Sequence, residues 1–270
     1  MDEKTAALVL QIHQRNLIDG NHILHHKGLL DAYGHLSIRH PLEPDAFIMS
    51  RNMGPATVSS TSDLVSLAIP DAEAFDPSSP EGYAERRIHS EIYKRHPTVQ
   101  AVVHSHSDAV DPFTIGAVPL RACIHTAGFL GTQPVPVYDA MDHSQEVGEE
   151  GGRGRNPLLD SEYLAYELAK YFDGENSVAL VRGHGFVVAA EHLELAVQQA
   201  IYTRKNAQVQ AAALALSAAA TPGESAMGRL RFLTEFEASE AANATRWSAH
   251  RPWRLWIREV ESSGLYVNFA

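Results

Sequence analysis

The sequence has almost no cysteine and fewer basic than acidic residues. Cys123 is the only cysteine among 270 residues, which excludes a disulfide within the chain and a cysteine-based zinc cluster, and predicts a small buried side chain in a reduced compartment. The 22 lysines and arginines stand against 33 aspartates and glutamates, a formal net charge of −11. This excess argues against nucleic acid or an anionic membrane as the main partner, whereas a small anionic molecule fits a pocket that holds a few arginines.

Long hydrophobic runs are also missing. No stretch approaches the roughly 18 apolar residues of a membrane span, and the first residues, MDEKTAALVLQIHQ, lack the apolar core of a signal peptide. We therefore expect no membrane partner and a cytoplasmic location. Hydrophobic residues make up 44% of the chain and charged residues 20%, a balance typical of a packed globular protein and unlike that of a disordered or fibrous one.

The positions of apolar residues, prolines and glycines predict alternating helices and strands. We expect helices over residues 5–27, 80–96, 158–172 and 191–216, strands over 34–39, 45–50, 98–103, 135–138 and 177–181, a capped turn or short helix over 60–67, and a flexible glycine-rich loop over 148–154. This order indicates an α/β fold with helices on both faces of a central sheet. Residues 218–224 are typical of a linker, so we expect a main domain over 1–220 and a C-terminal helical extension over 221–270, packed on that domain or on a neighbouring subunit.

Histidine is the unusual residue, with 15 copies. His104 and His106 follow the apolar run of a predicted strand, in which side chains two residues apart point to the same face. His184 ends a second predicted strand between two glycines, which let the backbone turn sharply and leave room beside the ring. Three neutral imidazoles that meet at one point would bind a divalent transition-metal ion and leave coordination positions open for a substrate. The alternative is three separate histidines with structural roles.

A carboxylate would complete such a site, and Glu85 is the candidate. It lies on the predicted helix directly before the His104 strand, with His89 four residues further on and therefore on the same helical face. Glu85 would then bind the metal or transfer a proton. The alternative is a solvated carboxylate on the surface of the helix.

Three segments, in chain order, resemble the motif set of the class II aldolase/adducin superfamily: Glu85-x3-His89-x2-Ile92-Tyr93, Val99-x-Ala101-Val-Val-His104-x-His106, and Arg182-Gly-His184-Gly185. The resemblance covers most of the chain, from about Gly28 to Leu216. It implies a class II aldolase-like fold, with a central mixed β-sheet flanked by helices and a C-terminal helical tail. It also implies a zinc or similar ion bound by the three histidines, a carboxylate at Glu85 that acts as acid/base and can coordinate the metal, and a homotetramer with active sites at subunit interfaces.

The sequence departs from the sugar-phosphate aldolases of this superfamily at the phosphate-binding segments. Where those enzymes carry a G-N-x-S segment and a T/S-P-S-G loop, this chain has Gly34-His35-Leu-Ser37 and a loop that contains Ser50-Arg51. The variant pattern resembles a decarboxylase branch that acts on hydroxylated aromatic or pyridine carboxylates, such as dihydroxyphthalates and hydroxypyridine dicarboxylates. Its segments are Leu30-Asp31-x2-Gly34-His35-x-Ser37-x-Arg39, Ser50-Arg51, His125-x3-Phe129-Leu130-Gly131 and Tyr202-x3-Asn206.

This branch assigns expected roles to three further residues. Arg51 would hold a second substrate carboxylate through a bidentate pair, with a salt bridge inside the loop as the alternative. His35 and His125 would carry protons, because imidazole titrates near neutral pH; the alternative for each is a hydrogen-bonded structural histidine. The metal would stabilise negative charge on a ring oxygen. Histidine with a carboxylate suits Zn²⁺ or Mn²⁺, and also Co²⁺ or Fe²⁺.

The sequence therefore predicts a metal-dependent carbon–carbon lyase that acts on a small, anionic molecule, with decarboxylation as the first choice. Aldol cleavage or epimerisation is the second, because an enediolate also places negative charge on a metal-bound oxygen. A non-catalytic, adducin-like interaction module is the third, and the retention of His104, His106 and His184 counts against it.

Overall fold

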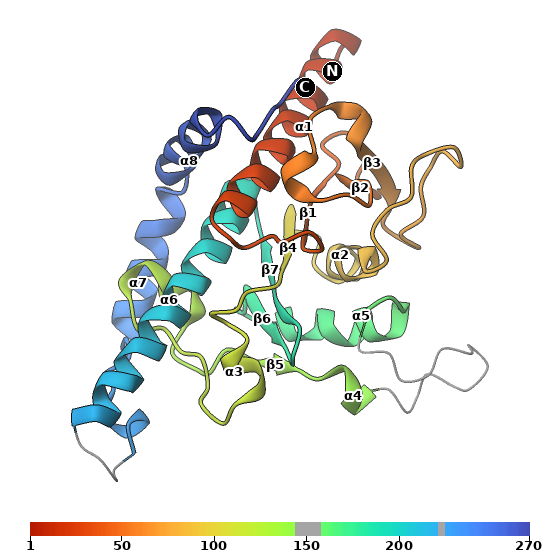
Figure 1. The fold of residues 1–270 in the computed structure, drawn as a ribbon. Helices are drawn as coiled ribbons and strands as arrows, with labels where there is room; N and C mark the ends of the chain where they lie inside the picture. Colours follow the sequence, from red (N-terminus) through yellow and green to blue (C-terminus); the bar gives the residue numbers. More distant parts are fainter. Residues whose placement is uncertain (144–157, 221–224) are drawn as a thin grey trace.

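A seven-stranded sheet forms the centre of the molecule in the computed structural model, which describes residues 1–143, 158–220 and 225–270. The strand order is β3-β2-β1-β4-β7-β6-β5 (Figure 1). All neighbouring strands are antiparallel except β5 and β6, which confirms the mixed sheet. The strands are β1 (His35–Arg39), β2 (Ala46–Ser50), β3 (Leu64–Ala68), β4 (Ala101–Ser105), β5 (Val137–Tyr138), β6 (Val178–Val181) and β7 (Gly185–Ala190).

Helices cover both faces of this sheet, as predicted (Figure 1). The core on one face includes apolar side chains of α1 (Glu3–His26), α6 (Leu193–Ala220) and α8 (His250–Ser262). The core on the other face includes side chains of α2 (Arg86–Arg95) and α5 (Glu162–Ala169). The remaining helical segments are short, apart from α7 (Glu235–Trp247), which packs against η3 (His125–Leu130). They are η1 (Pro55–Thr57), η2 (Thr61–Asp63), α3 (Pro112–Ile115), α4 (Ala140–His143), η5 (Lys170–Phe172) and η6 (Met227–Arg229).

Strand β4 shows how the sequence sets the two faces of the sheet. Ala101 and Val103 belong to the core under α1, α6 and α8, whereas Val102 belongs to the core under α2 and α5. Because side chains alternate along a strand, His104 emerges on the α2 side. His35 on β1 is its direct cross-strand partner, so two histidines face the same helix.

The predicted helix over residues 80–96 is wrong at its start, because α2 begins only at Arg86. Gly82 has a low helix propensity, and the Tyr83 hydroxyl donates a hydrogen bond to the Met53 carbonyl. Residues 80–85 therefore follow the neighbouring loop before the helix begins. Glu85 is consequently the residue that precedes the helix, and not a member of one of its faces.

Other predicted boundaries also need correction. Of residues 60–67, only the η2 turn is helical; the apolar run that follows is β3, where Val65 and Leu67 alternate inward on an edge strand paired with β2. The predicted strand over 98–103 starts later, because a turn precedes it, and continues through His104 to Ser105 along the ladder with β7. β7 itself was not predicted. The strand over 135–138 shrinks to β5, and the helix over 158–172 starts at Glu162 and ends in η5.

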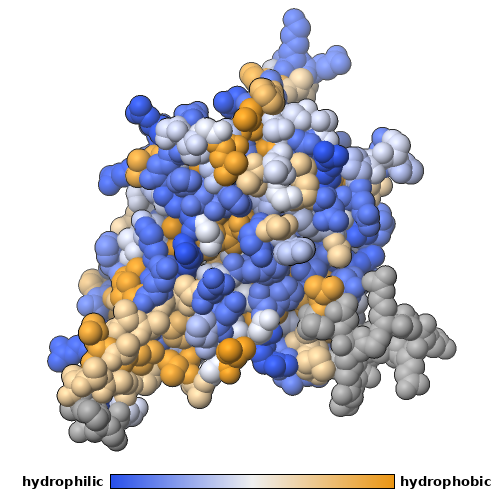
Figure 2. All heavy atoms as spheres, in the orientation of Figure 1, coloured by the Kyte–Doolittle hydropathy of each residue, from blue (hydrophilic) through white to orange (hydrophobic). Residues whose placement is uncertain are grey.

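Two sequence predictions lie outside the described residues, at least in part. The glycine-rich loop predicted over 148–154 lies entirely outside them. Of the linker predicted over 218–224, residues 221–224 lie outside, and residues 218–220 belong to α6 instead. None of the helices described here is long and apolar enough to cross a bilayer. Apolar and alanine side chains gather on the surface near the C-terminal end of α6, where Leu216 is 73% exposed (Figure 2).

Candidate metal centre

Four side chains from three parts of the fold converge at one end of the central strands, where β4 ends and β7 begins. β4 supplies His104, the residue just past its end is His106, the turn between β6 and β7 carries His184, and Glu85 precedes α2. One ligand atom from each residue lies within 4.8 Å of the other three. The three imidazole ring centroids form a triangle with sides of 4.9, 5.0 and 5.0 Å. The structure thus brings together the four residues that the sequence analysis selected as metal ligands.

A close approach of two backbones places His184 in this cluster. Gly185 has a φ of +139°, and a Cβ atom at this position would lie 2.1 Å from the carbonyl oxygen of Ser105. Only glycine fits here, so the β6–β7 turn lies directly against the end of β4. The Gly183 N–H donates to the Thr114 hydroxyl over 3.0 Å, which fixes the other side of the turn.

Glu85 is buried, with an exposed fraction of 7%, so its interpretation as a solvated carboxylate is wrong. The backbone N–H of Leu159 donates to Oε1 over 2.9 Å. The other oxygen, Oε2, lies 3.5 Å from Nε2 of His184 and 3.7 Å from Nε2 of His104. One oxygen therefore anchors the side chain, and the second faces the histidines.

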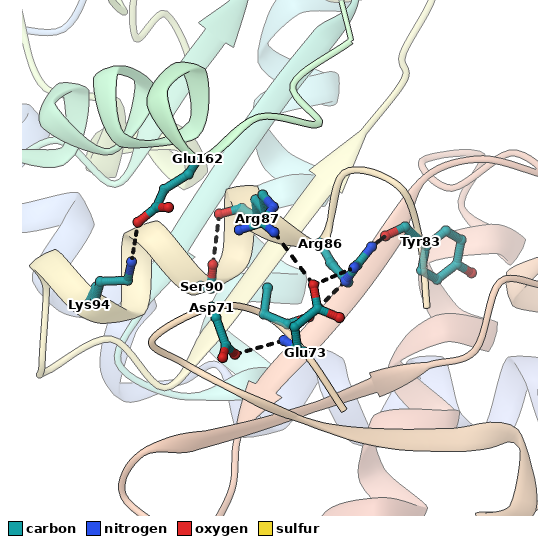
Figure 3. A network of polar contacts seen from close by, with 9 residues as sticks. Asp71, Glu73, Tyr83, Arg86, Arg87, Ser90, Lys94 and Glu162 are labelled. Carbon is teal, nitrogen blue, oxygen red and sulfur yellow. Dashed lines mark hydrogen bonds and ion pairs between the residues drawn. The ribbon is translucent and has the colours of Figure 1, made fainter. Parts of the chain in front are cut away.

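A polar network outside the cluster holds the first turn of α2 (Figure 3). Glu73 accepts hydrogen bonds from the guanidinium groups of Arg86 and Arg87 over 3.1 and 3.5 Å. Arg86 also donates to the Tyr83 carbonyl over 3.2 Å. Because the two residues that follow Glu85 are tied to the neighbouring loop, the backbone beneath its carboxylate is fixed.

The charges in the metal-free cluster follow from these contacts. Burial raises the pKa of Glu85, but the hydrogen bond to His184 and the nearby histidines outweigh it and lower that pKa to about 2. Burial lowers the pKa of His184, and the Glu85 carboxylate reverses this effect, so that the pKa ends above its usual value. Burial lowers the pKa of His104 to about 3. The ionised Glu85 thus favours a protonated His184 beside a neutral His104.

The donor set fits a divalent transition-metal ion. Nε2 of His104 and Nε2 of His106 are 3.2 Å apart. Tetrahedral Zn–N bonds of about 2.0–2.1 Å place their donor atoms about 3.3 Å apart, close to this separation and to the 3.5 and 3.7 Å of the Glu85 contacts. Three imidazoles and one carboxylate are ligands that zinc, manganese, iron and cobalt accept.

A second, fully enclosed group of polar side chains lies behind the cluster. Nδ1 of His35 is 2.6 Å from Nε2 of His89, and Nδ1 of His89 is 2.6 Å from the Ser37 hydroxyl, which is 2.8 Å from the Tyr93 hydroxyl. All four residues are at most 1% exposed. Because buried polar groups are costly without partners, this series of hydrogen bonds fixes His35 and His89 firmly.

His35 ends this series next to the cluster. Its ring centroid is 5.0 Å from that of His104 and 4.8 Å from that of Tyr83, and its Nε2 atom is buried without a hydrogen-bond partner. Burial, together with the neighbouring histidines, holds the pKa of His35 well below its usual range. The position therefore keeps His35 neutral and close to the cluster.

The remaining predicted residues lie differently. Arg51 is half-exposed and pairs with Asp63 over 3.1 Å, which is the loop salt bridge considered as its alternative role. Ser50, next to it, contacts the Tyr83 hydroxyl over 3.1 Å, so the loop adjoins His35. His125 is exposed at the start of η3, and within the described residues it makes no hydrogen bond or ring contact with the cluster.

The structure adds one neighbour that the sequence analysis did not assign. Asp31 lies in the loop before β1, and both of its carboxylate oxygens are 3.3 Å from Nδ1 of His106. Asp31 belongs to the quoted decarboxylase-like pattern, but its distance of 75 residues from His106 hides the contact. His89, selected only for its helical face, turns out to support His35.

Comparison with known proteins agrees with this architecture. Residues 15–211 match the model of the class II aldolase and adducin N-terminal domain family. The decarboxylase tropJ of Talaromyces stipitatus is 45% identical over 258 residues, covering 95% of this chain and 97% of the relative. The 3,4-dihydroxyphthalate decarboxylase of Arthrobacter keyseri is 28% identical over 191 residues, covering 66% of this chain and 69% of the relative.

Solved structures share the fold at low sequence identity. An aldolase II superfamily protein from Pseudomonas syringae has a TM-score of 0.71 at 21% identity, covering 95% of this chain and 94% of the other. L-fuculose 1-phosphate aldolase from Glaciozyma antarctica has a TM-score of 0.68 at 19% identity, covering 97% and 93%. With the family match and the relative that is 45% identical, these findings show that the chain belongs to the class II aldolase and adducin family and is a lyase.

Proposed function

We propose that this lyase is a divalent-metal-dependent decarboxylase of a hydroxylated aromatic or heteroaromatic carboxylate. The observation that carries the proposal is the convergence of His104, His106, His184 and Glu85 within 4.8 Å. The names of two relatives support the reaction class, because both are decarboxylases and one acts on a dihydroxyphthalate. We further propose Zn²⁺ or Mn²⁺ as the ion.

The reaction sets clear chemical demands. The bond between the ring carbon and the carboxylate breaks, its electron pair stays on the ring, and the ring carbon takes up one proton. A divalent ion held by the three histidines would supply a Lewis acid that stabilises the negative charge developing on the substrate. The protein must still orient the substrate and deliver the proton.

Glu85 is suited to take a proton from the substrate hydroxyl and pass it to the ring carbon, because its carboxylate is ionised in the metal-free cluster. Its Oε1 atom is held by the Leu159 N–H, so rotation cannot withdraw Oε2 from the cluster. His35 is the second candidate, because its buried Nε2 atom has no partner and its ring contacts His104. The hydrogen bonds that run from His35 through His89 and Ser37 to Tyr93 keep that ring in place. In the part of the chain that the structure describes, His125 makes no hydrogen bond or ring contact with the cluster of its own chain. We therefore propose that it carries a proton only at the site of a neighbouring subunit.

Two arginines on loops of this domain are candidates for binding an anionic substrate. Arg182 precedes the His184 turn and pairs with Asp139. Arg51 pairs with Asp63 and is 45% exposed along its side chain. A planar substrate carboxylate would compete for a guanidinium of this kind, because the two groups match in a bidentate geometry.

One assay separates decarboxylation from aldol cleavage. Metal-loaded protein is incubated with ortho-hydroxylated aromatic acids in one series and with fuculose or ribulose phosphates in the other, and CO₂ and aldehyde are measured separately. We expect CO₂ from an aromatic acid and no aldehyde. Aldehyde from a sugar phosphate, with no CO₂ from any aromatic acid, would overturn the decarboxylase and favour the aldolase.

We also propose that the chain forms a homotetramer in the cytoplasm, with the C-terminal extension over 221–270, which contains α7 and α8, at subunit contacts. Large apolar side chains are exposed on and near these helices: Phe236 is 75% exposed, Trp247 81% and Leu216 73%. Exposed apolar surface of this kind is typical of interfaces. Light scattering of the purified protein would give four chains per particle; a monomer would contradict the proposal.

A further inference from the structure

The loop that joins α1 to β1 places one carboxylate against the cluster. Oδ1 of Asp31 accepts hydrogen bonds from the backbone N–H groups of Tyr33 and Gly34, each over 2.8 Å. Both carboxylate oxygens are also 3.3 Å from Nδ1 of His106. Asp31 thus closes a tight turn and contacts a ring in the cluster at the same time.

His106 needs an outside contact more than its neighbours do. His104 lies inside β4, and its side chain is fully buried, whereas His106 follows the strand and its side chain is 23% exposed. Its Nε2 atom faces Nε2 of His104, so Nε2 is the atom available to a metal. The ring can present Nε2 as a lone pair only if its proton is on Nδ1.

We propose that Asp31 is a positioning residue of the metal centre, which holds the proton of His106 on Nδ1 and fixes the ring with Nε2 toward the ion. A carboxylate is an acceptor only, so it selects the tautomer with hydrogen on Nδ1. This inference rests on the proposed metal centre. It concerns how tightly the chain binds the ion and not which substrate is used.

The variant Asp31→Asn retains the turn and replaces one of the two oxygens beside His106 by a donor. The amide oxygen can still accept the Tyr33 and Gly34 N–H groups, so the turn is retained. The amide NH₂ then takes the place of Oδ2 and competes with the retained oxygen, because both positions are 3.3 Å from Nδ1 of His106. An N–H donor selects a lone pair on Nδ1, which moves the proton to Nε2 and opposes metal binding. Loss of such a partner weakens metal affinity by about 10–100-fold.

The experiment measures Zn²⁺ affinity by titrating metal-free protein against a chromophoric chelator. Asp76→Asn is the matched control, because Oδ1 of Asp76 accepts the Ser78 N–H over 2.8 Å in the same kind of turn, with no histidine beside it. We expect Asp31→Asn to bind Zn²⁺ about 10–100-fold more weakly and Asp76→Asn to bind it as the wild type does. Asp31→Ser, whose hydroxyl caps the turn but is too short to contact His106, should show a loss of the same order.

A double-mutant cycle distinguishes positioning from general damage to the fold. In a His106→Ala background, Asp31→Asn should change Zn²⁺ affinity by less than about twofold, because its partner ring is absent. Wild-type affinity in both Asp31→Asn and Asp31→Ser, or an equal loss from Asp31→Asn in both backgrounds, would overturn the role of Asp31 while the metal centre stands. A wild-type protein that binds no Zn²⁺ or Mn²⁺ would overturn the proposed function as well.

Discussion

Two groups of histidines lie on the same side of the sheet and differ in almost every other respect. We call the histidines of the metal cluster, His104, His106 and His184, the open group, and His35 and His89 the enclosed group. His106 and His184 have side chains that are 23% and 15% exposed, and the ionised Glu85 faces His184. His35 and His89 are at most 1% exposed, and His89 faces a hydroxyl. The pKa of His184 is accordingly raised, whereas burial lowers that of His89 to about 3. The partner and the degree of burial, and not the residue type, therefore decide whether the pKa of a histidine is raised or lowered.

Removing the charge of Glu85 tests the open group most severely. We expect Glu85→Gln to lower the turnover of the decarboxylation by about 10²–10⁴-fold, the range typical of acid–base residues. Steady-state kinetics on the metal-loaded protein measures the effect. Glu91→Gln is the matched control, because Glu91 lies on α2, the helix that Glu85 precedes, is also buried, and pairs with Lys94 instead of the cluster. Near-normal turnover in Glu85→Gln would leave Glu85 with a structural role.

The fully buried histidines His35, His89 and His104 should make the metal-free protein less stable in mild acid. Unfolded histidines gain protons below about pH 6.5, whereas folded His89 and His104 stay neutral down to about pH 3, and the pKa of His35 is also far below its usual range. The unfolded state therefore binds more protons, and the free energy of unfolding should fall by about 1.4 kcal/mol per pH unit for each of these histidines as the pH drops below 6.5. His184 has the opposite sign: its contribution is complete below pH 6.5 and is lost as the pH rises through its raised pKa.

Urea denaturation of the metal-free protein between pH 7 and pH 5 measures this dependence. A free energy of unfolding that is constant over this range would contradict the burial of the three neutral histidines. The variant His89→Leu should reduce the slope by the share of one histidine.

Breaking the hydrogen bonds of the enclosed group should lower the free energy of unfolding by a smaller amount. His89→Leu preserves the approximate volume but leaves Nδ1 of His35 without its partner, and removes one of the two partners of Ser37. We expect the free energy of unfolding to fall by about 1–3 kcal/mol, the cost of leaving a buried polar group unsatisfied. Urea denaturation at pH 7 measures it, with His13→Ala on the exposed face of α1 as a control that should change the value by about 0.5 kcal/mol or less. An unchanged stability in His89→Leu would show that these hydrogen bonds are not a support.

The sequence predicts the open group better than the enclosed one, for a physical reason. An H-x-H segment after a buried strand and a histidine between two glycines carry local signals. Glycine is required at 185 because a Cβ atom there would lie 2.1 Å from the Ser105 carbonyl oxygen. The hydrogen bonds of the enclosed group join β1 to α2, between residues up to 56 positions apart, and no local pattern specifies how this helix packs on this strand. The contact of Asp31 with His106 is hidden for the same reason.

The fold shows the same division between local and long-range signals. The long helices and most strands follow from apolar periodicity, whereas the start of α2 depends on the hydrogen bond of Tyr83 to Met53. Glu85 gains its place because the helix starts at the next residue and Leu159 donates to its carboxylate. The sequence analysis selected Glu85 because of its helical spacing to His89, which is not what brings Glu85 to the cluster.

The metal content of the purified protein tests the central claim most directly. If His104, His106, His184 and Glu85 form one centre, inductively coupled plasma mass spectrometry should find close to one divalent ion per wild-type chain and almost none in His104→Ala or His184→Ala. The His35→Ala protein, in which the enclosed group is altered and all four ligands remain, should retain its ion. Full occupancy in both His104→Ala and His184→Ala would contradict the account.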